Sequence, residues 1–331
     1  MTIHRMLKWE PTEKKFIYDT SNPLKCDMMI VDETSMLDIT LAVNLFRAVK
    51  PGTTVIMVGD ADQLPSVGPG QVLNDFIGSG IFTYTHLKKI FRQGEGSRIV
   101  SNAHTVNEGF MPEIHKMPKD ELSDFYWVEL DEPEKVTEMI VKLVKERIPA
   151  RFGFDFMKDI QVLTPMNRGQ CGTVTLNELL QNELNSGGKA QFKHGERTFK
   201  IGDRVMQTSN NYDKKVFNGD MGRISHIDMH ESIFSVLYDE MTINYEFAEA
   251  DQITLAYAVT VHKAQGCEFP AVVMPLLTQH YMMLQRKLLY TAMTRAKRLL
   301  VLIGSKKAVS MAVRNVSSEP RYSMLLTRLK N

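Results

Sequence analysis

Two short apolar segments, each followed at once by acidic residues, constrain the fold of this chain most. Met28–Val31 and Thr54–Val58 are rich in β-branched and other apolar side chains, which is typical of buried strands in a parallel sheet. Leu37–Val49 between them has helical spacing and ends at Pro51-Gly52. We therefore expect a strand–helix–strand unit with polar residues at the carboxyl ends of its strands, where open α/β sheets bind ligands.

The polar residues at these strand ends indicate nucleotide hydrolysis. Asp32 follows the first strand and would hold Mg²⁺, because Mg²⁺ prefers oxygen ligands and keeps several waters. Glu33 beside it would orient or deprotonate the attacking water. On this dipeptide alone, a solvated turn is the more common structure. Gln63 follows the second strand, and a glutamine there can sense a γ-phosphate or position the water, which favours hydrolysis.

Two longer segments resemble motifs of a known enzyme family. VDETSMLD from Val31 and GDADQLPSVGPGQVL from Gly59 resemble motifs II and III of superfamily 1 helicases, most closely the RecD-like branch. Thr2–Leu7 resembles the short DNA-contacting motif that precedes motif II in that family. Residues at about 8–24 resemble a hairpin that splits the duplex there, although the local sequence alone fits an ordinary surface hairpin.

Four later segments match the family in the same order. Lys88–Gln93 resembles motif IV, Thr254–Glu268 (where helical texture resumes) resembles motif V, and Leu288–Lys297 resembles motif VI. Thr164–Thr173, which reads TPMNRGQCGT, resembles a loop that contacts single-stranded DNA in the family. Its residues alone fit a glycine-rich strand-to-helix turn equally well.

The resemblance implies a role for each matching residue, with ATP and Mg²⁺ as cofactors. Arg295 would act as an arginine finger, a group that contributes roughly 10³–10⁵ in rate. The implied catalytic residues are Glu33, Gln63, Arg92 and Arg295. The implied nucleotide-binding residues are Asp32, Gln265, Gly266 and Glu268, with Asp32 also the metal ligand. The implied DNA-binding residues are His4, Pro65, Asn167, Arg168, Thr260 and His262.

A change of sequence texture marks an insertion. Ala190–Ala250 shows short alternating runs separated by turns, which predicts a small all-β structure. Its GDRVMQ…NGDMGRI pattern resembles the SH3-like subdomain of the family. Four of its basic residues could meet DNA phosphates, although solvated lysines are the commoner case. These are Arg204, Lys214, Lys215 and Arg223.

The expected fold class is α/β, with tandem RecA-like P-loop NTPase domains, the first one incomplete, and a small SH3-like all-β insertion in the second. The expected domain bounds are 1–82 for the first domain including the hairpin, 83–187 and 251–331 for the second, and 188–250 for the insertion.

No GxxxxGK[ST] segment occurs in the chain. Such a loop supplies the backbone amides and the lysine that bind nucleotide phosphates. In the family it lies upstream of the motif that Thr2–Leu7 resembles. We therefore interpret the chain as the carboxyl-terminal portion of a helicase, cut just before that motif, and expect it to be inactive on its own.

The resemblance implies an ATP-dependent DNA helicase that moves 5′ to 3′ along single-stranded DNA. The alternative is a non-catalytic nucleic-acid-binding remnant or subunit, which the missing loop favours. Against it, a binding module needs none of the catalytic residues named above. An RNA helicase is a weaker alternative, because related motors use the same motif set. Nothing in the sequence resembles a nuclease site.

Composition leaves this function open. The net charge of +1 neither supports nor excludes a nucleic-acid partner, which needs just a local basic surface. The three cysteines lack metal-binding spacing and indicate reduced thiols. With no secretory signal or membrane-length apolar run, we expect a cytoplasmic protein that does not bind membranes. The expected partners are single-stranded DNA and single-strand/duplex junctions, and further repair or recombination proteins stay open.

Overall fold

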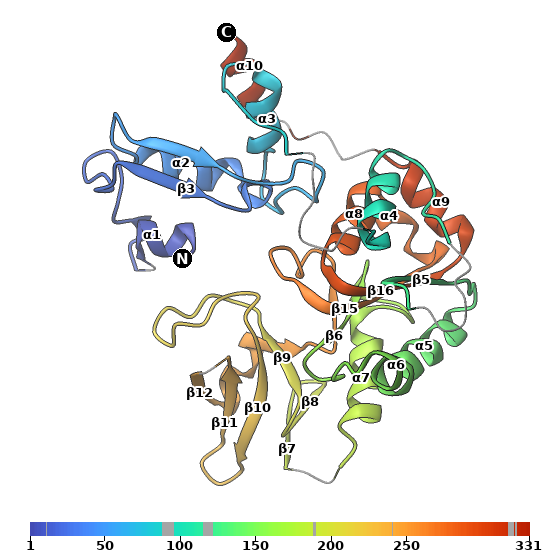
Figure 1. The fold of residues 1–331 in the computed structure, drawn as a ribbon. Helices are drawn as coiled ribbons and strands as arrows, with labels where there is room; N and C mark the ends of the chain where they lie inside the picture. Colours follow the sequence, from blue (N-terminus) through green and yellow to red (C-terminus); the bar gives the residue numbers. More distant parts are fainter. Residues whose placement is uncertain are drawn as a thin grey trace. The chain divides into compact units, whose positions relative to one another are not determined.

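The computed structural model describes residues 1–10, 12–87, 96–114, 122–187, 190–239, 241–316, 321 and 323–331. The chain divides into two compact units (Figure 1). The first comprises residues 1–90 and 317–331, and the second comprises residues 91–316.

The first unit contains the predicted strand–helix–strand. Strands β3 (Met28–Val31) and β4 (Thr54–Met57) pair in parallel, with Met28 opposite Thr54. Helix α2 (Ile39–Arg47) connects them and begins at Asp38, whose Oδ1 accepts a hydrogen bond from the Leu41 amide at 2.8 Å. The remaining elements of the first unit are α1 (Ile3–Leu7), β1 (Trp9–Glu10), β2 (Lys15–Phe16), the 3₁₀ helix η1 (Thr34–Met36), α3 (Val72–Ser79) and α10 (Leu325–Lys330).

The two faces of the β3–β4 pair differ. On one face Met29 and Val31 pack in a buried cluster with side chains of α2. The opposite face leaves apolar side chains exposed, namely Met28, Ile30, Ile56 and Val58. Parallel strands are usually covered on both faces, so the exposed apolar face departs from the usual arrangement. The expectation of an incomplete first domain stays a prediction.

The second unit is built on a five-stranded sheet in the order β14-β6-β15-β16-β5, with every pairing parallel. Figure 1 shows α4, α8 and α9 grouped on one side of it and α5, α6 and α7 on the other. The strands are β5 (Phe125–Val128), β6 (Ile160–Thr164), β14 (Ala258–Thr260), β15 (Phe269–Leu276) and β16 (Ala296–Gly304). The helices are α4 (Arg98–Asn107), α5 (Pro133–Lys142), the π-helix η2 (Leu143–Arg147), α6 (Ile148–Phe152), α7 (Thr173–Leu184), the 3₁₀ helix η4 (Thr278–Met283), α8 (Arg286–Thr294) and α9 (Lys306–Arg314).

The predicted all-β insertion in the second domain is confirmed. It holds a five-stranded antiparallel sheet in the order β12-β11-β10-β9-β13 and a separate β7–β8 hairpin. Its elements are β7 (Gln191–His194), β8 (Arg197–Lys200), β9 (Arg204–Gln207), β10 (Met221–Asp228), β11 (Ile233–Tyr238), β12 (Met241–Glu246), the 3₁₀ helix η3 (Phe247–Gln252) and β13 (Ile253–Leu255).

The end of the chain belongs to the first unit, whereas the domain bounds expected from the sequence placed it in the second domain. Those bounds gave residues 251–331 to the second domain, whereas the structure groups residues 317–331 with the first unit. The physical reason is that α10 packs against α3, and Arg321 donates hydrogen bonds to backbone carbonyls of the first unit.

A buried carboxylate joins the insertion to the RecA-like sheet. Asp203, just before β9, is fully buried, and burial raises its pKa. Its Oδ1 accepts hydrogen bonds from Asn185 Nδ2 at 2.7 Å and the Tyr257 hydroxyl at 2.9 Å. Its Oδ2 accepts them from Gln181 Nε2 at 2.6 Å and the Lys200 amide at 2.7 Å. One side chain therefore connects α7, the end of β8 and the segment that enters β14.

We expect Asp203→Ala to destabilise the protein, because buried donors lose their acceptor. The free energy of unfolding should fall by about 2–4 kcal/mol, since each unsatisfied buried donor costs about 1–3 kcal/mol. Urea unfolding followed by circular dichroism measures this. Asp213→Ala, at an exposed position in the insertion, is the matched control. Equal midpoints for the two variants would contradict the role given to Asp203.

Candidate nucleotide and DNA sites

The predicted nucleotide residues of the first unit lie at the carboxyl ends of β3 and β4. Asp32 is exposed, and its Oδ1 accepts a hydrogen bond from the Glu33 amide at 2.8 Å. Glu33 has φ 51° and ψ 40°, a left-handed conformation that is uncommon for a residue other than glycine. The Thr34 amide donates to the Val58 carbonyl at 2.9 Å, which fastens the exit of β3 to the exit of β4.

Gln63 lies in the loop that follows β4. Its side chain is 8% exposed, and its Nε2 donates to Asp60 Oδ2 at 3.2 Å. A Cβ added at Gly59 would lie 3.0 Å from the backbone nitrogens of Thr34 and Ser35. The lack of a side chain at Gly59 therefore lets the loop carrying Gln63 contact the loop carrying Asp32 and Glu33.

The two DNA-binding candidates of the first unit lie on different elements. His4 is in α1, its ring centroid is 5.7 Å from that of Phe16, and burial lowers its pKa while the nearby Asp38 charge acts in the opposite direction. Pro65 is partly exposed and lies two residues beyond Gln63 in the same loop.

The DNA-binding candidates of the second unit lie on loops that leave neighbouring strands. Asn167 and Arg168 follow β6 and are exposed, and Thr260 ends β14, two residues before His262. Because Thr260 is paired with Thr164 across the two parallel strands, both loops begin at the same edge of the sheet. The structure therefore brings these four predicted residues to one edge.

Local contacts fix the loop after β6. The Thr173 hydroxyl donates to Asn167 Oδ1 at 3.0 Å. Gly169 has φ +91°, and a Cβ at Gly172 would lie 2.5 Å from the carbonyl oxygens of Asn167 and Arg168. Two of its glycines are thus required by the backbone, and the side chains of Asn167 and Arg168 remain toward solvent.

Motifs V and VI meet at the opposite edge, where β15 and β16 begin. Arg295 is 1% exposed, and its Nη1 donates to the Cys267 carbonyl at 3.0 Å and its Nε to the Thr291 carbonyl at 3.3 Å. The Phe269 amide donates to the Arg295 carbonyl at 2.9 Å. The proposed finger therefore packs directly against the motif V segment.

The other motif V candidates lie in the same short segment. Gln265 is buried, and Gly266 has φ +76°. Glu268 forms an ion pair with Lys297 at 2.9 Å, a partner that the sequence reasoning missed. The sequence feature that could have indicated Lys297 is its position in motif VI, two residues after Arg295. The remaining nucleotide candidate, Arg92, lies outside the described residues.

One basic residue predicted to meet DNA phosphates is placed elsewhere. The guanidinium of Arg204 is buried, its Nη1 donates to the Ile160 carbonyl at 2.8 Å, and burial lowers its pKa to about 10. The prediction for Arg204 is therefore wrong, because the side chain faces the sheet of β6 instead of solvent. Lys214 pairs with Glu249 at 2.5 Å, whereas Lys215 and Arg223 are exposed.

The residues described fit a magnesium ion better than a closed metal site. Among them, three or more His, Cys, Asp or Glu side chains nowhere gather into a metal-binding cluster. Asp32 offers one exposed carboxylate, which suits Mg²⁺ because this ion keeps most of its waters. Within the same part of the chain, every helix is too short or too polar to cross a membrane.

Comparison with solved structures defines the class of fold. A Pif1 helicase studied for DNA unwinding at forked duplex DNA has a TM-score of 0.56 at 18% identity, covering 96% of this chain and 80% of that chain. Pif1 helicase from Bacteroides in complex with ADP-AlF3 and single-stranded DNA has a TM-score of 0.55 at 17% identity, covering 99% of this chain and 82% of that chain. The fold is thus that of RecA-like helicase domains with an SH3-like insertion, as predicted.

Family profiles and curated relatives narrow the class to one branch. Residues 1–69 match an AAA domain, residues 176–238 the ATP-dependent RecD-like DNA helicase SH3 domain, and residues 255–303 the UvrD-like helicase C-terminal domain. The ATP-dependent RecD2 DNA helicase of Deinococcus radiodurans is 33% identical over 330 residues, which cover 99% of this chain and 43% of that protein. The RecBCD enzyme subunit RecD of Mycolicibacterium smegmatis is 29% identical over 320 residues, which cover 94% of this chain and 56% of that protein.

The predicted relationship to RecD-like helicases of superfamily 1 is therefore confirmed. The chain spans about half the length of the curated relatives it matches.

The burial of Arg204 leads to a prediction that separates folding from DNA contact. Arg204→Gln should lower the free energy of unfolding by about 1–3 kcal/mol, because a buried charged hydrogen bond is lost. It should leave the salt dependence of single-stranded DNA binding unchanged. Arg168→Gln should leave the free energy of unfolding unchanged. It should reduce the slope of log K against log salt by about 0.7, as expected for one phosphate contact on a single strand. Urea unfolding and fluorescence anisotropy at several salt concentrations test both variants. A reduced slope for Arg204→Gln would restore it as a phosphate contact.

Proposed function

We propose that this chain is the motif II to motif VI portion of an ATP-dependent DNA helicase that moves 5′ to 3′ along single-stranded DNA. The observation that carries the proposal is the gathering of polar motif residues at the strand ends of two RecA-like units. The loops with Asp32, Glu33 and Gln63 touch in the first unit, and Arg295 packs on motif V in the second. A module that merely binds nucleic acid does not need these residues.

In the proposed reaction each of these residues has one task. Asp32 holds Mg²⁺, which neutralises charge on the phosphates when it is bound. Glu33 accepts the proton of the attacking water, and Gln63 orients that water. Water adds to the γ-phosphorus, the bond to the β-γ bridging oxygen breaks, and ADP and phosphate leave. Arg295 stabilises the charge that develops on the transferred phosphoryl group, and the resemblance to motif IV assigns a second contact with that group to Arg92, which lies outside the described residues.

Motif V supports a link between hydrolysis and movement on DNA. Residues 261–268 run from the carboxyl end of β14, where Thr260 lies, to the amino end of β15, beside Arg295. The segment thus connects the edge that carries the DNA candidates to the edge that carries the nucleotide candidates. A shift at one edge can therefore be transmitted to the other, as alternate opening and closing of the motor requires.

The absent GxxxxGK[ST] loop defines what we propose for the chain by itself. Without amides to cradle the phosphates, it binds ATP weakly and does not hydrolyse it. It still binds single-stranded DNA and junctions of single strands with duplex. We also propose a cytoplasmic location. Further repair or recombination proteins stay open as partners.

The first test is DNA binding by the 331-residue chain. We expect salt-dependent binding of labelled oligothymidylate, weakened about tenfold by Asn167→Ala together with His262→Ala, since the two side chains lie at one edge and the loss of both contacts together costs on the order of 1.4 kcal/mol. The matched control replaces Asn210 and His230, exposed residues of the insertion, with alanine. Equal weakening by the control pair, or no binding at all, would count against the proposed DNA surface.

The second test is ATP hydrolysis. A longer form that carries GxxxxGK[ST] ahead of Thr2 should hydrolyse ATP when single-stranded DNA is added, and Glu33→Gln should lower kcat by about 10²–10⁴ because the general base is removed. The 331-residue chain should show no DNA-stimulated hydrolysis. Hydrolysis by the short chain that Glu33→Gln leaves intact would overturn the proposal. A longer form that binds DNA without hydrolysing ATP would instead establish the alternative of a binding protein.

A further inference from the structure

An arginine from the end of the chain holds the loop that follows Gln63. Arg321 Nη1 donates to the carbonyl oxygens of Ser66 at 2.6 Å, Gly68 at 2.7 Å and Gly70 at 3.1 Å. The three carbonyls converge on one nitrogen although they come from alternate residues of an irregular loop. Arg321 is separated from this loop by about 250 residues of sequence, and both belong to the first unit.

The same loop is held on its other side by the start of α2. The Ile39 amide donates to the Pro69 carbonyl at 2.9 Å, so the loop contacts the first turn of α2. A Cβ at Gly68 would lie 2.6 Å from Asp38 Oδ2, and one at Gly70 would lie 3.1 Å from Ile39 Cβ. Residues 66–70 are therefore clamped between the start of α2 and the end of the chain.

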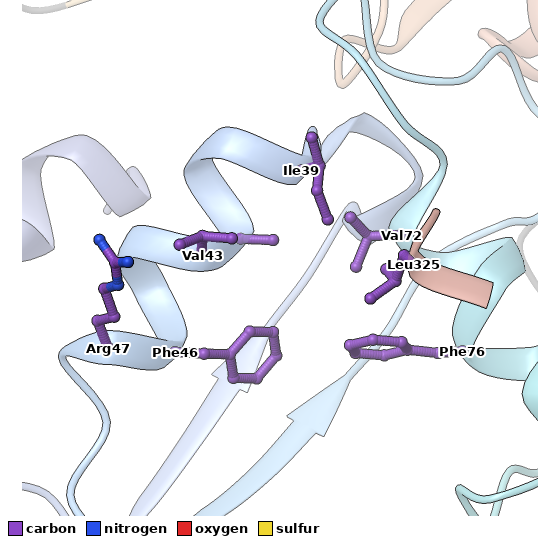
Figure 2. A pocket seen from close by; sticks show the side chains of 8 residues that line it. Ile39, Val43, Phe46, Arg47, Val72, Phe76 and Leu325 are labelled. Carbon is purple, nitrogen blue, oxygen red and sulfur yellow. The ribbon is translucent and has the colours of Figure 1, made fainter. Parts of the chain in front are cut away.

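Two more contacts fix the chain end on the first unit. The Ser323 hydroxyl donates to Asp75 Oδ2 in α3 at 3.2 Å. Leu325, at the start of α10, lines an apolar pocket with Val72 and Phe76, and Figure 2 shows its side chain beside theirs. The position of Arg321 thus follows from an anchored segment and does not depend on one polar contact.

We propose that Arg321 is a positioning residue for motif III. By holding residues 66–70 it fixes the loop that carries Gln63 and Pro65, so the end of the chain sets where these two side chains meet nucleotide and DNA. The inference rests on the functions proposed for Gln63 and Pro65. In this proposal Arg321 acts through the loop carbonyls that its Nη1 contacts and not through a contact of its own with nucleotide or DNA.

The geometry also predicts which substitution keeps the function. One nitrogen of Arg321 donates all three hydrogen bonds. The ammonium group of a lysine, which has three N–H donors, can therefore replace them in part. Arg321→Lys should therefore retain most of the effect, whereas Arg321→Ala removes it. Arg328→Ala is the matched control, since Arg328 is an exposed residue of α10 in the same segment.

Hydrogen exchange on the 331-residue chain tests the clamp itself. With Arg321→Ala we expect about tenfold faster exchange of amides in residues 60–72 and at Ile39, which reports a larger open population. Exchange in β15 and β16 should not change, and Arg328→Ala and Arg321→Lys should resemble the parent. Unchanged exchange in Arg321→Ala, or no recovery in Arg321→Lys, overturns the clamp.

Binding of labelled oligothymidylate tests the consequence. If the released loop is correctly placed about one tenth of the time, Arg321→Ala weakens binding about tenfold. The slope of log K against log salt should stay the same, because no phosphate contact is lost. A reduced slope overturns a positioning role by making Arg321 a direct contact, and parent-like affinity overturns the effect on Pro65. A parent chain that does not bind DNA refutes the proposed function instead, while hydrogen exchange still decides the clamp.

Discussion

Two adjacent buried charges, Asp203 and Arg204, tie the SH3-like insertion to the RecA-like sheet. The carboxylate collects donors from α7, the end of β8 and Tyr257, and the guanidinium donates to the Ile160 carbonyl of β6. Burying a charge is costly unless it is well hydrogen-bonded, so each contact favours one arrangement of the two sheets over others. The insertion and the sheet that carries it accordingly belong to one compact unit. The loop after β6, with Asn167 and Arg168, lies on that same domain.

The strands that position the nucleotide residues could be predicted because they are short, apolar and bounded by acids or glycine. That pattern gave β3 and β4, and with them the edge that carries Asp32, Glu33 and Gln63. It also gave β6, which leads to Asn167 and Arg168. Residues 254–260 have an equally apolar run that suggested helical texture, but they form β13 and β14. An apolar run of this length does not distinguish a buried strand from a buried helix, so tertiary pairing with β6 and β9 decides.

Roles of individual cations could not be predicted in the same way. Arg204 begins a run that the sequence predicts as an alternating strand, where an arginine is usually solvated. All of β9 is buried instead, and the acceptor of Arg204 lies 44 residues earlier. Arg321 lies in a short polar stretch without periodicity, so its pairing with residues 66–70 left no trace in the local sequence. By contrast, the sequence predicts a glycine-rich turn at residues 164–173, and a Cβ at Gly172 would meet the carbonyls of Asn167 and Arg168 in the same loop. That steric limit is local in sequence, whereas the partner of a long charged side chain depends on the whole fold.

The contacts of Arg295 bear on how the motor would couple its two sites. Its guanidinium is engaged by the carbonyls of Cys267 and Thr291, so reaching a phosphoryl group requires exchanging at least part of these bonds for bonds to the nucleotide. Exchange with the phosphoryl oxygens would remove the bond that Arg295 donates to the Cys267 carbonyl, which lies in the segment that starts at Thr260. Hydrolysis changes the charge on the nucleotide and would then change how firmly Arg295 holds Cys267. Residues 261–267 join Cys267 to Thr260, so the edge with the DNA-binding candidates would be affected through seven residues of backbone, without a larger rearrangement of the sheet. Under the proposed function, the bonds of Arg295 to the carbonyls of Cys267 and Thr291 would contribute to this coupling, because one nucleotide state would favour them and the other would favour bonds to the phosphoryl group.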